Sequence, residues 1–322
     1  MRKGAALFLA ALIAAAPLTA AAQDQADCKF QDADADWATE AMQAWAIARD
    51  DLLKVPEAET PARLILYDAA CTFTVDADPW RAAAHGGEIE TPDGGKLPAK
   101  VASFAAAFGE GQPFLVMALP SIWEAQGVKS DLGLPTMLTG VFLHEMTHTR
   151  QMTGLYPRIG AFQKAYGGSD FDDDIVQTRF EANAAFKAGI DAERDLLYRA
   201  AAAATDAEAR ALARQAHARI AARRAKWFTG KDAMFAEAED TFLTLEGSGQ
   251  WVAYAWLTKH PLGAEIEPAT ALTAFRRGGR KWSQDEGLAL FLVIDRLVPD
   301  WQARVFSDEP ASALQLLAEA TR

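Results

Sequence analysis

Two histidines and a glutamate near the middle of the chain have the spacing of a metal-binding site. His144 and His148 are four residues apart, so on a helix both imidazoles lie on one face and reach the same ion. Glu145 points away from that axis, where its carboxylate can hold and deprotonate a water molecule without binding the metal. Histidine is scarce here, with 5 among 322 residues, so the pattern rarely arises by chance. The three residues predict a zinc centre that activates water.

The surrounding sequence predicts the helix that this spacing requires. Pro135 suits the first turn of a helix, where its missing N–H costs nothing. Met137 and Val141 continue the stripe of the two histidines at spacings of three and four, so both rings face the buried side. The alternative is a core helix whose histidines are satisfied by hydrogen bonds. Two ionisable rings one turn apart are costly to bury without a shared partner, which favours the metal.

The motif resembles the metal-binding helix of the zincin metallopeptidases. Uncharged Met146 and Thr147 fill its two variable positions, and an apolar run precedes the first histidine. The metzincin branch also needs glycine at position 151 and histidine at 154, where this chain has Gln151 and Gly154. The resemblance is therefore to the gluzincins and covers the motif, not the whole chain. It implies a zinc hydrolase whose third ligand is a glutamate on a later helix.

Glu246 is the first choice for that third ligand. It lies 98 residues after His148 in a segment, E-G-S-G, that resembles the E-G-x-A segment of the gluzincins. A glycine inside a helix costs up to about 1 kcal/mol relative to alanine. Gly247 and Gly249 therefore suggest that this helix packs closely against another one, as a ligand helix crossing the metal helix must.

Two other glutamates remain as alternatives. Glu286 begins an E-G-L-A segment, which matches the gluzincin pattern more literally, but Ser283 and Glu286 also have the spacing of a capping box. Glu181 lies 33 residues after His148 among small residues, at a more ordinary spacing for this class. The acidic run at 170–174 could donate an aspartate or bind calcium, but it lacks the spacing of an EF-hand and is typical of a solvated loop.

Stabilising the negative charge that develops on an attacked carbonyl needs a further hydrogen-bond donor. Residue type and position after the motif leave four candidates: Tyr156, Arg179, Tyr254 and His260.

The first 22 residues resemble a secretory signal peptide. Arg2 and Lys3 precede an apolar stretch from Ala5 to Leu18, and small residues follow up to Ala22. The stretch is too short and too rich in alanine for a membrane anchor, and no later apolar run reaches the ~18 residues that a membrane span needs. We therefore expect an exported protein, periplasmic or secreted, whose mature chain is 23–322.

Composition narrows the partners and the redox state. The chain has 32 basic and 44 acidic residues, a formal net charge of −12 that becomes −14 when Arg2 and Lys3 are removed. This balance argues against nucleic acid or an anionic membrane as partner and favours solubility. The resemblance to the zincins implies a peptide or protein substrate. Cys28 and Cys71 are the only cysteines, and in an oxidising compartment an even pair predicts one disulfide.

The remaining sequence predicts an α+β, mainly α-helical chain of one catalytic unit. Its N-terminal α/β part (23–133) carries a helix and a small sheet, and its helical part (134–322) carries the metal site. Zincins have such a sheet before the metal-binding helix, so the resemblance implies a zincin-like fold. The expected helices are 37–53, 175–203, 206–227, 231–257 and 284–297, and the expected strands are 64–67, 71–75 and 114–117.

Together these features predict an exported zinc metallopeptidase with Glu145 as general base. Two alternatives stay open on the sequence alone. One is a zinc hydrolase of non-peptide amides or esters. The other is a metal-binding protein without turnover, although metal binding alone does not require Glu145.

Overall fold

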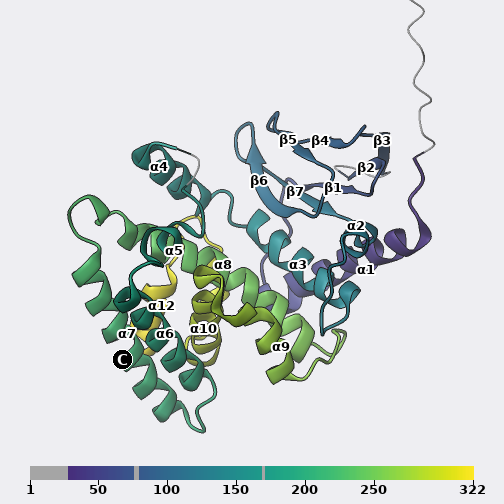
Figure 1. Cartoon of the computed structure of the whole chain (residues 1–322). Helices are drawn as coiled ribbons and strands as arrows, with labels where there is room; N and C mark the ends of the chain where they lie inside the picture. Colours follow the sequence, from purple (N-terminus) through teal and green to yellow (C-terminus); the bar gives the residue numbers. More distant parts are fainter. Residues whose placement is uncertain (1–27, 76–79, 169–170) are drawn as a thin grey trace, which may run out of the picture.

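The computed structural model describes residues 28–75, 80–168 and 171–322, and it has a small sheet beside a larger group of helices (Figure 1). The predicted α+β, mainly helical architecture is confirmed. The predicted signal peptide lies outside the described residues. Within the described part of the chain, no helix is long and apolar enough to cross a membrane.

The main sheet has the strand order β3-β2-β1-β7-β6. β1 and β7 are parallel and the other neighbouring strands are antiparallel, so β3 and β6 form the two edges. β4 and β5 make a separate antiparallel pair. The strands are β1 Arg63–Tyr67, β2 Cys71–Val75, β3 Arg81–Ala84, β4 Glu88–Glu90, β5 Lys96–Pro98, β6 Ser103–Phe108 and β7 Gln112–Ala118.

The three strands expected from the sequence correspond to β1, β2 and β7. The sequence does not predict β3 or β6, because both contain runs of alanine, which has a weak intrinsic preference for strands. Hydrogen bonding to β2 and β7 holds these two strands in the sheet. β6 matters for the site, since it is the edge strand that contacts the helix with His144 and His148.

The helices follow most of the expected segments. They are α1 Asp32–Ala48, α2 Pro120–Ala125, α3 Leu134–Thr149, α4 Tyr156–Tyr166, α5 Ile175–Phe180, α6 Ala184–Ala201, α7 Asp206–Trp227, α8 Phe235–Lys259, α9 Pro268–Arg276, α10 Trp282–Leu297, α11 Trp301–Val305 and α12 Ala313–Ala320. α1 continues into a π-helical turn, Arg49–Leu53. The prediction of one helix over 175–203 is wrong. Asn183 caps α6 by accepting hydrogen bonds from two backbone N–H groups, and this separates α6 from α5.

The two faces of the sheet have different covers. Successive residues of a strand point to opposite faces, so Leu64 and Leu66 pack with α1 and α3 in one apolar cluster. Ile65 and Tyr67 pack on the other face with residues of α2 and of the β4–β5 pair. The helix α3, which contains His144, Glu145 and His148, is therefore held by the sheet on one side. The predicted disulfide between Cys28 and Cys71 is present and ties the segment before α1 to β2.

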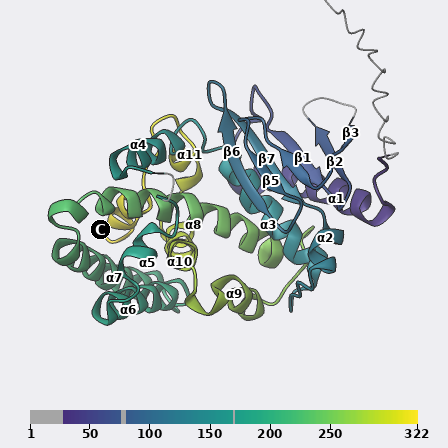
Figure 2. The same cartoon turned by 45° about the horizontal axis from the view of Figure 1, so that its top comes forward.

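α8 is the central helix of the molecule. It is buried along most of its length, from Phe235 to Leu257, and it packs against α3 on one side and α10 on the other. α6 and α7 pack against each other beside α10 (Figure 2). α12 contacts α10, α7 and α8. Because α8 contacts both α3 and the C-terminal helices, it brings residues far apart in the sequence to the same place.

Candidate metal centre

The His-Glu-x-x-His residues are buried and close together at the C-terminal end of α3. The Nε2 atoms of His144 and His148 lie 2.9 Å apart, and their rings meet edge to face with centroids 4.4 Å apart. With Glu145 they form a group whose ligand atoms all lie within 4.8 Å of one another. Nitrogen and carboxylate oxygen are the donors that zinc takes in catalytic sites, so this buried set fits a metal ion.

α8 places Glu246 against both imidazoles. Its Oε2 lies 3.3 Å from Nε2 of His144, and its Oε1 lies 3.4 Å from Nε2 of His148. Burial opposes ionisation of Glu246, but the charge of His148 and hydrogen bonds from both histidines hold the pKa of the carboxyl far below its ordinary value. Burial also opposes the charged form of His148, but Glu246 raises the pKa of that imidazole to about 9. Glu246 is thus held in its charged form, and its negative charge stabilises a positive charge beside it.

A glutamine fixes the orientation of His148. The Oε1 atom of Gln151 lies 2.9 Å from Nδ1 of His148, and Nε2 of Gln151 donates to Oγ of Ser248, 2.8 Å away on α8. Ser248 in turn donates to the carbonyl of Leu245, so its hydroxyl oxygen accepts from the amide N–H₂ of Gln151. The amide oxygen therefore faces the imidazole and accepts from Nδ1–H, which leaves Nε2 facing the site.

The two glycines of the E-G-S-G segment have different neighbours. A Cβ atom on Gly249 would lie 2.8 Å from Nδ1 of His144. A Cβ atom on Gly247 would lie 2.5 Å from the carbonyl oxygen of Gly287 on α10. Contacts under 3.0 Å are essentially never made by real Cβ atoms. α8 thus approaches α3 at one glycine and α10 at the other, as the pair of glycines in the sequence suggests.

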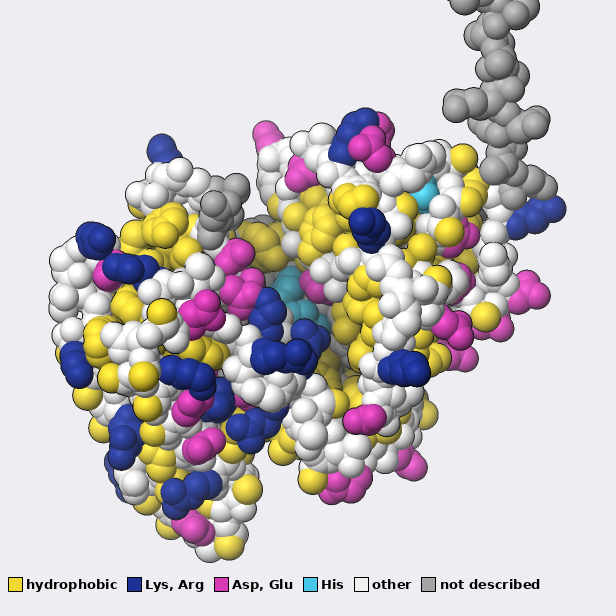
Figure 3. Space-filling view, viewed as in Figure 1, with side chains coloured by type: hydrophobic (Ala, Val, Ile, Leu, Met, Phe, Trp, Pro, Cys, Tyr) yellow, Lys and Arg dark blue, Asp and Glu magenta, His cyan; other side chains and the backbone are white. Residues whose placement is uncertain are grey.

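Glu145 has a different neighbour from the other site residues. Oγ of Ser103, the first residue of the edge strand β6, donates to Oε1 of Glu145 over 3.2 Å. Both residues line a cleft of about 710 Å³ between the sheet and the helical part. Figure 3 shows this hollow with a histidine side chain, in cyan, at its floor. The carboxylate of Glu145 is therefore placed between the metal-binding helix and open space that a substrate can enter.

Tyr156 is the one predicted charge-stabilising candidate with a clear electrostatic link to the centre. Burial, followed by the charges of Glu145, Glu246 and Asp173, raises the pKa of its phenol well above the ordinary value. Its hydroxyl donates to the carbonyl of Ala105 on β6 over 3.2 Å. Tyr156 begins α4, and this hydrogen bond holds its phenol against β6, although Tyr156 is not among the residues that line the cleft.

The other three candidates have different surroundings. Tyr254 belongs to the apolar core of the helical part. His260 lies at the end of α8 and pairs with Asp51 at 3.1 Å. Arg179 pairs with Asp232 at 3.0 Å on the surface. None of these three lines the cleft.

The two alternative ligands lie away from the histidines. Glu181 is exposed just after α5. Glu286 is buried among α6, α7 and α10, where burial and the charge of Glu193 raise the pKa of its carboxyl well above the ordinary value. The predicted capping box is wrong, because α10 begins at Trp282 and Ser283 is already inside the helix.

Two further polar residues surround Glu246. Nε2 of Gln284 on α10 donates to its Oε2 over 3.2 Å. Burial, and next the charge of Glu246, raise the pKa of Asp173 to about 7. Asp174 pairs with Lys281 on the other side of this segment. The acidic run is therefore more than the solvated loop expected from the sequence, since the carboxyl of Asp173 is partly buried and its pKa responds to Glu246.

Comparisons of the chain with protein-family models, with curated proteins and with solved structures gave no match. The geometry of the centre and of its cleft is thus the basis for a functional assignment.

Proposed function

We propose that this protein is an exported zinc-dependent peptidase. The observation that carries the proposal is the meeting of two imidazole Nε2 atoms and a carboxylate at one buried point, each atom 2.9–3.4 Å from the next, beside a cleft faced by Glu145. Two histidines and one carboxylate are a usual protein ligand set of catalytic zinc, which leaves a further position open.

His144, His148 and Glu246 would hold the metal. A bound zinc ion would polarise a carbonyl and lower the pKa of water to about 7. Gln151 would keep the Nε2 lone pair of His148 aimed at the ion, and Gln284 would hold one oxygen of Glu246. Such outer partners set the orientation of ligands and typically change metal affinity 10- to 100-fold when removed.

Glu145 would act as the general base. Its carboxylate would accept a proton from the water that attacks the carbonyl carbon, and would then deliver that proton to the leaving amine. The hydrogen bond from Ser103 would hold the carboxylate toward the cleft. Tyr156 would turn its O–H from the carbonyl of Ala105 to the oxygen that gains charge, and its raised pKa keeps the phenol protonated.

The edge strand β6 favours a peptide as substrate. In the described part of the sheet β6 pairs with β7 only, so its outer side has backbone N–H and C=O groups without a strand partner. An extended peptide can bind along such an edge through main-chain hydrogen bonds. Ser103 begins β6 and contacts Glu145, so a chain bound there would pass the proposed general base.

The test combines metal content with cleavage of a proteome-derived peptide library. We expect about one zinc per chain for the protein and for Glu145→Gln, and cleavage by the wild type alone. Zinc retained by the His144→Ala, His148→Ala double variant would refute the metal centre. If the protein holds zinc and hydrolyses amide or ester probes but cleaves no peptide, it is a zinc hydrolase of non-peptide amides or esters. Zinc without any hydrolysis would indicate a binding protein.

A further inference from the structure

One wall of the cleft carries three basic side chains, although the chain as a whole has a negative net charge. The chain has a net charge of −12, yet Lys129, Arg277 and Arg280 all line the cleft that begins at His144 and Glu145. Figure 3 shows Lys and Arg side chains, in dark blue, beside the hollow that holds the cyan histidine. Besides Glu145, only Asp131 contributes a carboxylate to this lining.

The two arginines come from the turn between α9 and α10. Arg277 has a φ of 47°, and Gly278 and Gly279 follow with φ of 66° and 72°. Left-handed conformation is unfavourable for a long side chain such as arginine, so this turn is held by its surroundings. Nε of Arg280 donates to the carbonyl of Arg277 over 3.0 Å, which ties the two residues together.

Neither arginine is used to hold the fold through an ion pair. The preceding residue gives the contrast, because Arg276 pairs with Asp285 at 3.3 Å and with Asp195 at 3.8 Å. Among the described residues, no carboxylate lies within ion-pair distance of Arg277, Arg280 or Lys129. Both guanidinium groups are exposed at the cleft. Their charge is therefore available to a molecule that enters it.

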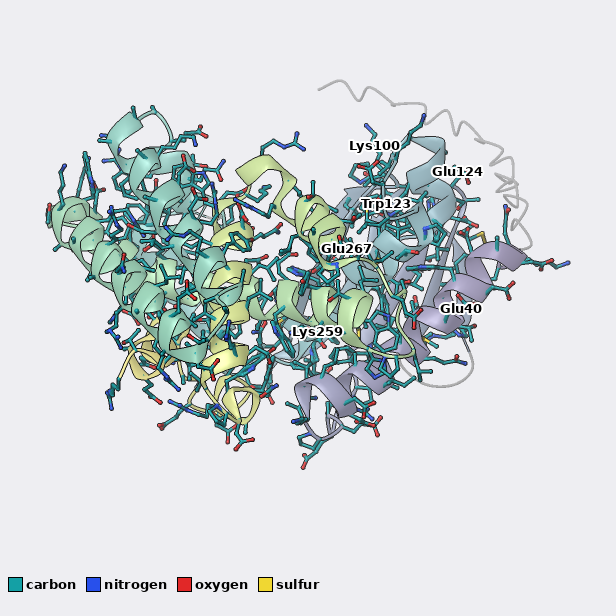
Figure 4. All side chains as sticks on the ribbon, turned by 90° about the horizontal axis from the view of Figure 1, so that it is seen from below. Glu40, Lys100, Trp123, Glu124, Lys259 and Glu267 are labelled. Carbon is teal, nitrogen blue, oxygen red and sulfur yellow. A yellow bond between two sulfur atoms is a disulfide. The ribbon has the colours of Figure 1, made fainter. Side chains whose placement is uncertain are left out.

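The cleft also has apolar side chains in its lining. Met137 and Val141 of α3, Leu257 of α8, Phe275 of α9 and Trp123 of α2 all line the same cleft. Figure 4 views this region from below, with Trp123 on α2 and Glu267 at the start of α9. A molecule bound in the cleft would therefore meet apolar and cationic side chains as well as His144 and Glu145.

We propose that this wall is a specificity subsite for a peptide carboxylate adjoining an apolar residue. A guanidinium binds a carboxylate through parallel, charge-assisted hydrogen bonds. A neighbouring apolar side chain of the peptide would contact the apolar residues that line the cleft. The carboxylate has two possible sources, an Asp or Glu side chain or the C-terminus of the peptide. The subsite deepens the proposed peptidase function and rests on it.

Binding to a variant without turnover tests the subsite separately from catalysis. The probes are two randomised hexapeptide libraries, one with free C-termini and one amidated, bound to immobilised, zinc-loaded Glu145→Gln and identified by mass spectrometry. We expect carboxylate-bearing peptides to be enriched about tenfold or more, the scale of a hydrogen bond between charged groups. Asp or Glu enrichment in both libraries assigns the side chain, and enrichment restricted to free C-termini assigns the terminus.

Substitution of the two arginines decides whether they cause the enrichment of carboxylate-bearing peptides. Arg277→Gln combined with Arg280→Gln, in the Glu145→Gln background, should abolish the enrichment while zinc content stays the same. Arg219→Gln on the exposed side of α7 removes a charge elsewhere and should leave it unchanged. Equal binding of acidic and neutral peptides, no binding of either library, or enrichment that survives the double substitution would each refute the subsite. Cleavage of the same libraries by the wild type reports on the peptidase function independently.

Discussion

Gly249 on α8 lies directly against the imidazole of His144 on α3. A Cβ atom at position 249 would be 2.8 Å from Nδ1 and 3.0 Å from Cε1 of that ring. The position where the gluzincin segment more often has alanine is thus restricted here by a residue of the metal centre. α8 can carry Glu246 to the histidines because the backbone at Gly249 comes this close.

The first prediction follows from that contact. Gly249→Ala should lower zinc affinity at least tenfold, because the added methyl group must displace the ring of His144. Alanine stabilises a helix by up to about 1 kcal/mol relative to glycine. A general loss of helix stability is therefore not the expected cause of the weaker zinc binding. Zinc competition with a chromogenic chelator measures the affinity. Gly160→Ala in α4, where a Cβ atom meets nothing within 4 Å, is the matched control and should bind zinc normally.

The second prediction separates the three glutamates. Glu246→Ala should weaken zinc binding by orders of magnitude, since it removes one of three proposed protein ligands. Glu181→Ala changes an exposed residue and should bind zinc as the wild type does. Glu286→Ala removes a buried carboxyl near Arg223 and should change the free energy of unfolding instead. The same competition assay, read beside thermal unfolding, distinguishes these outcomes. Normal zinc affinity in Glu246→Ala would exclude it as a ligand.

These residues show what a single sequence can reveal. His144, Glu145 and His148 belong to one helix, so their spacing alone places the two histidines on one face and Glu145 beside them. Glu246 is on another helix, and its identification from sequence depends on the adjoining glycines. The structure brings Glu246 to the two histidines and leaves Glu181 and Glu286 elsewhere.

The supporting residues are harder to predict. Gln151 follows His148 by three residues but lies beyond the end of α3, in a turn where its backbone N–H donates to the carbonyl of His148. Ser103 comes from an alanine-rich strand and Gln284 from a helix near the C-terminus, and nothing in their local sequence indicates the metal centre. Tertiary packing of β6 and α10 decides their positions.

The third prediction concerns Gln151. Gln151→Ala should weaken zinc binding about 10- to 100-fold, because His148 loses the acceptor that fixes its ring proton on Nδ1. Ser248→Ala removes only the next hydrogen bond and should have a smaller effect in the same direction. Zinc affinities of both variants, measured with the far-ultraviolet circular dichroism spectrum as a check on folding, test this order. The reverse order would mean that α8 positions His148 without Gln151.

The fourth prediction concerns Tyr156 in peptide hydrolysis. Tyr156→Phe should lower kcat about 10²- to 10³-fold with little change in KM, the range for loss of one donor to a developing oxyanion. Zinc content should not change, since the phenol is not a proposed ligand. Tyr67→Phe is the matched control, because Tyr67 also donates its hydroxyl to a backbone carbonyl, that of Lys100, but lies on the far face of the sheet. Steady-state kinetics on one cleaved peptide measure both variants. An equal loss of kcat in Tyr156→Phe and Tyr67→Phe would show that Tyr156 acts through its hydrogen bond to β6 and not on the substrate.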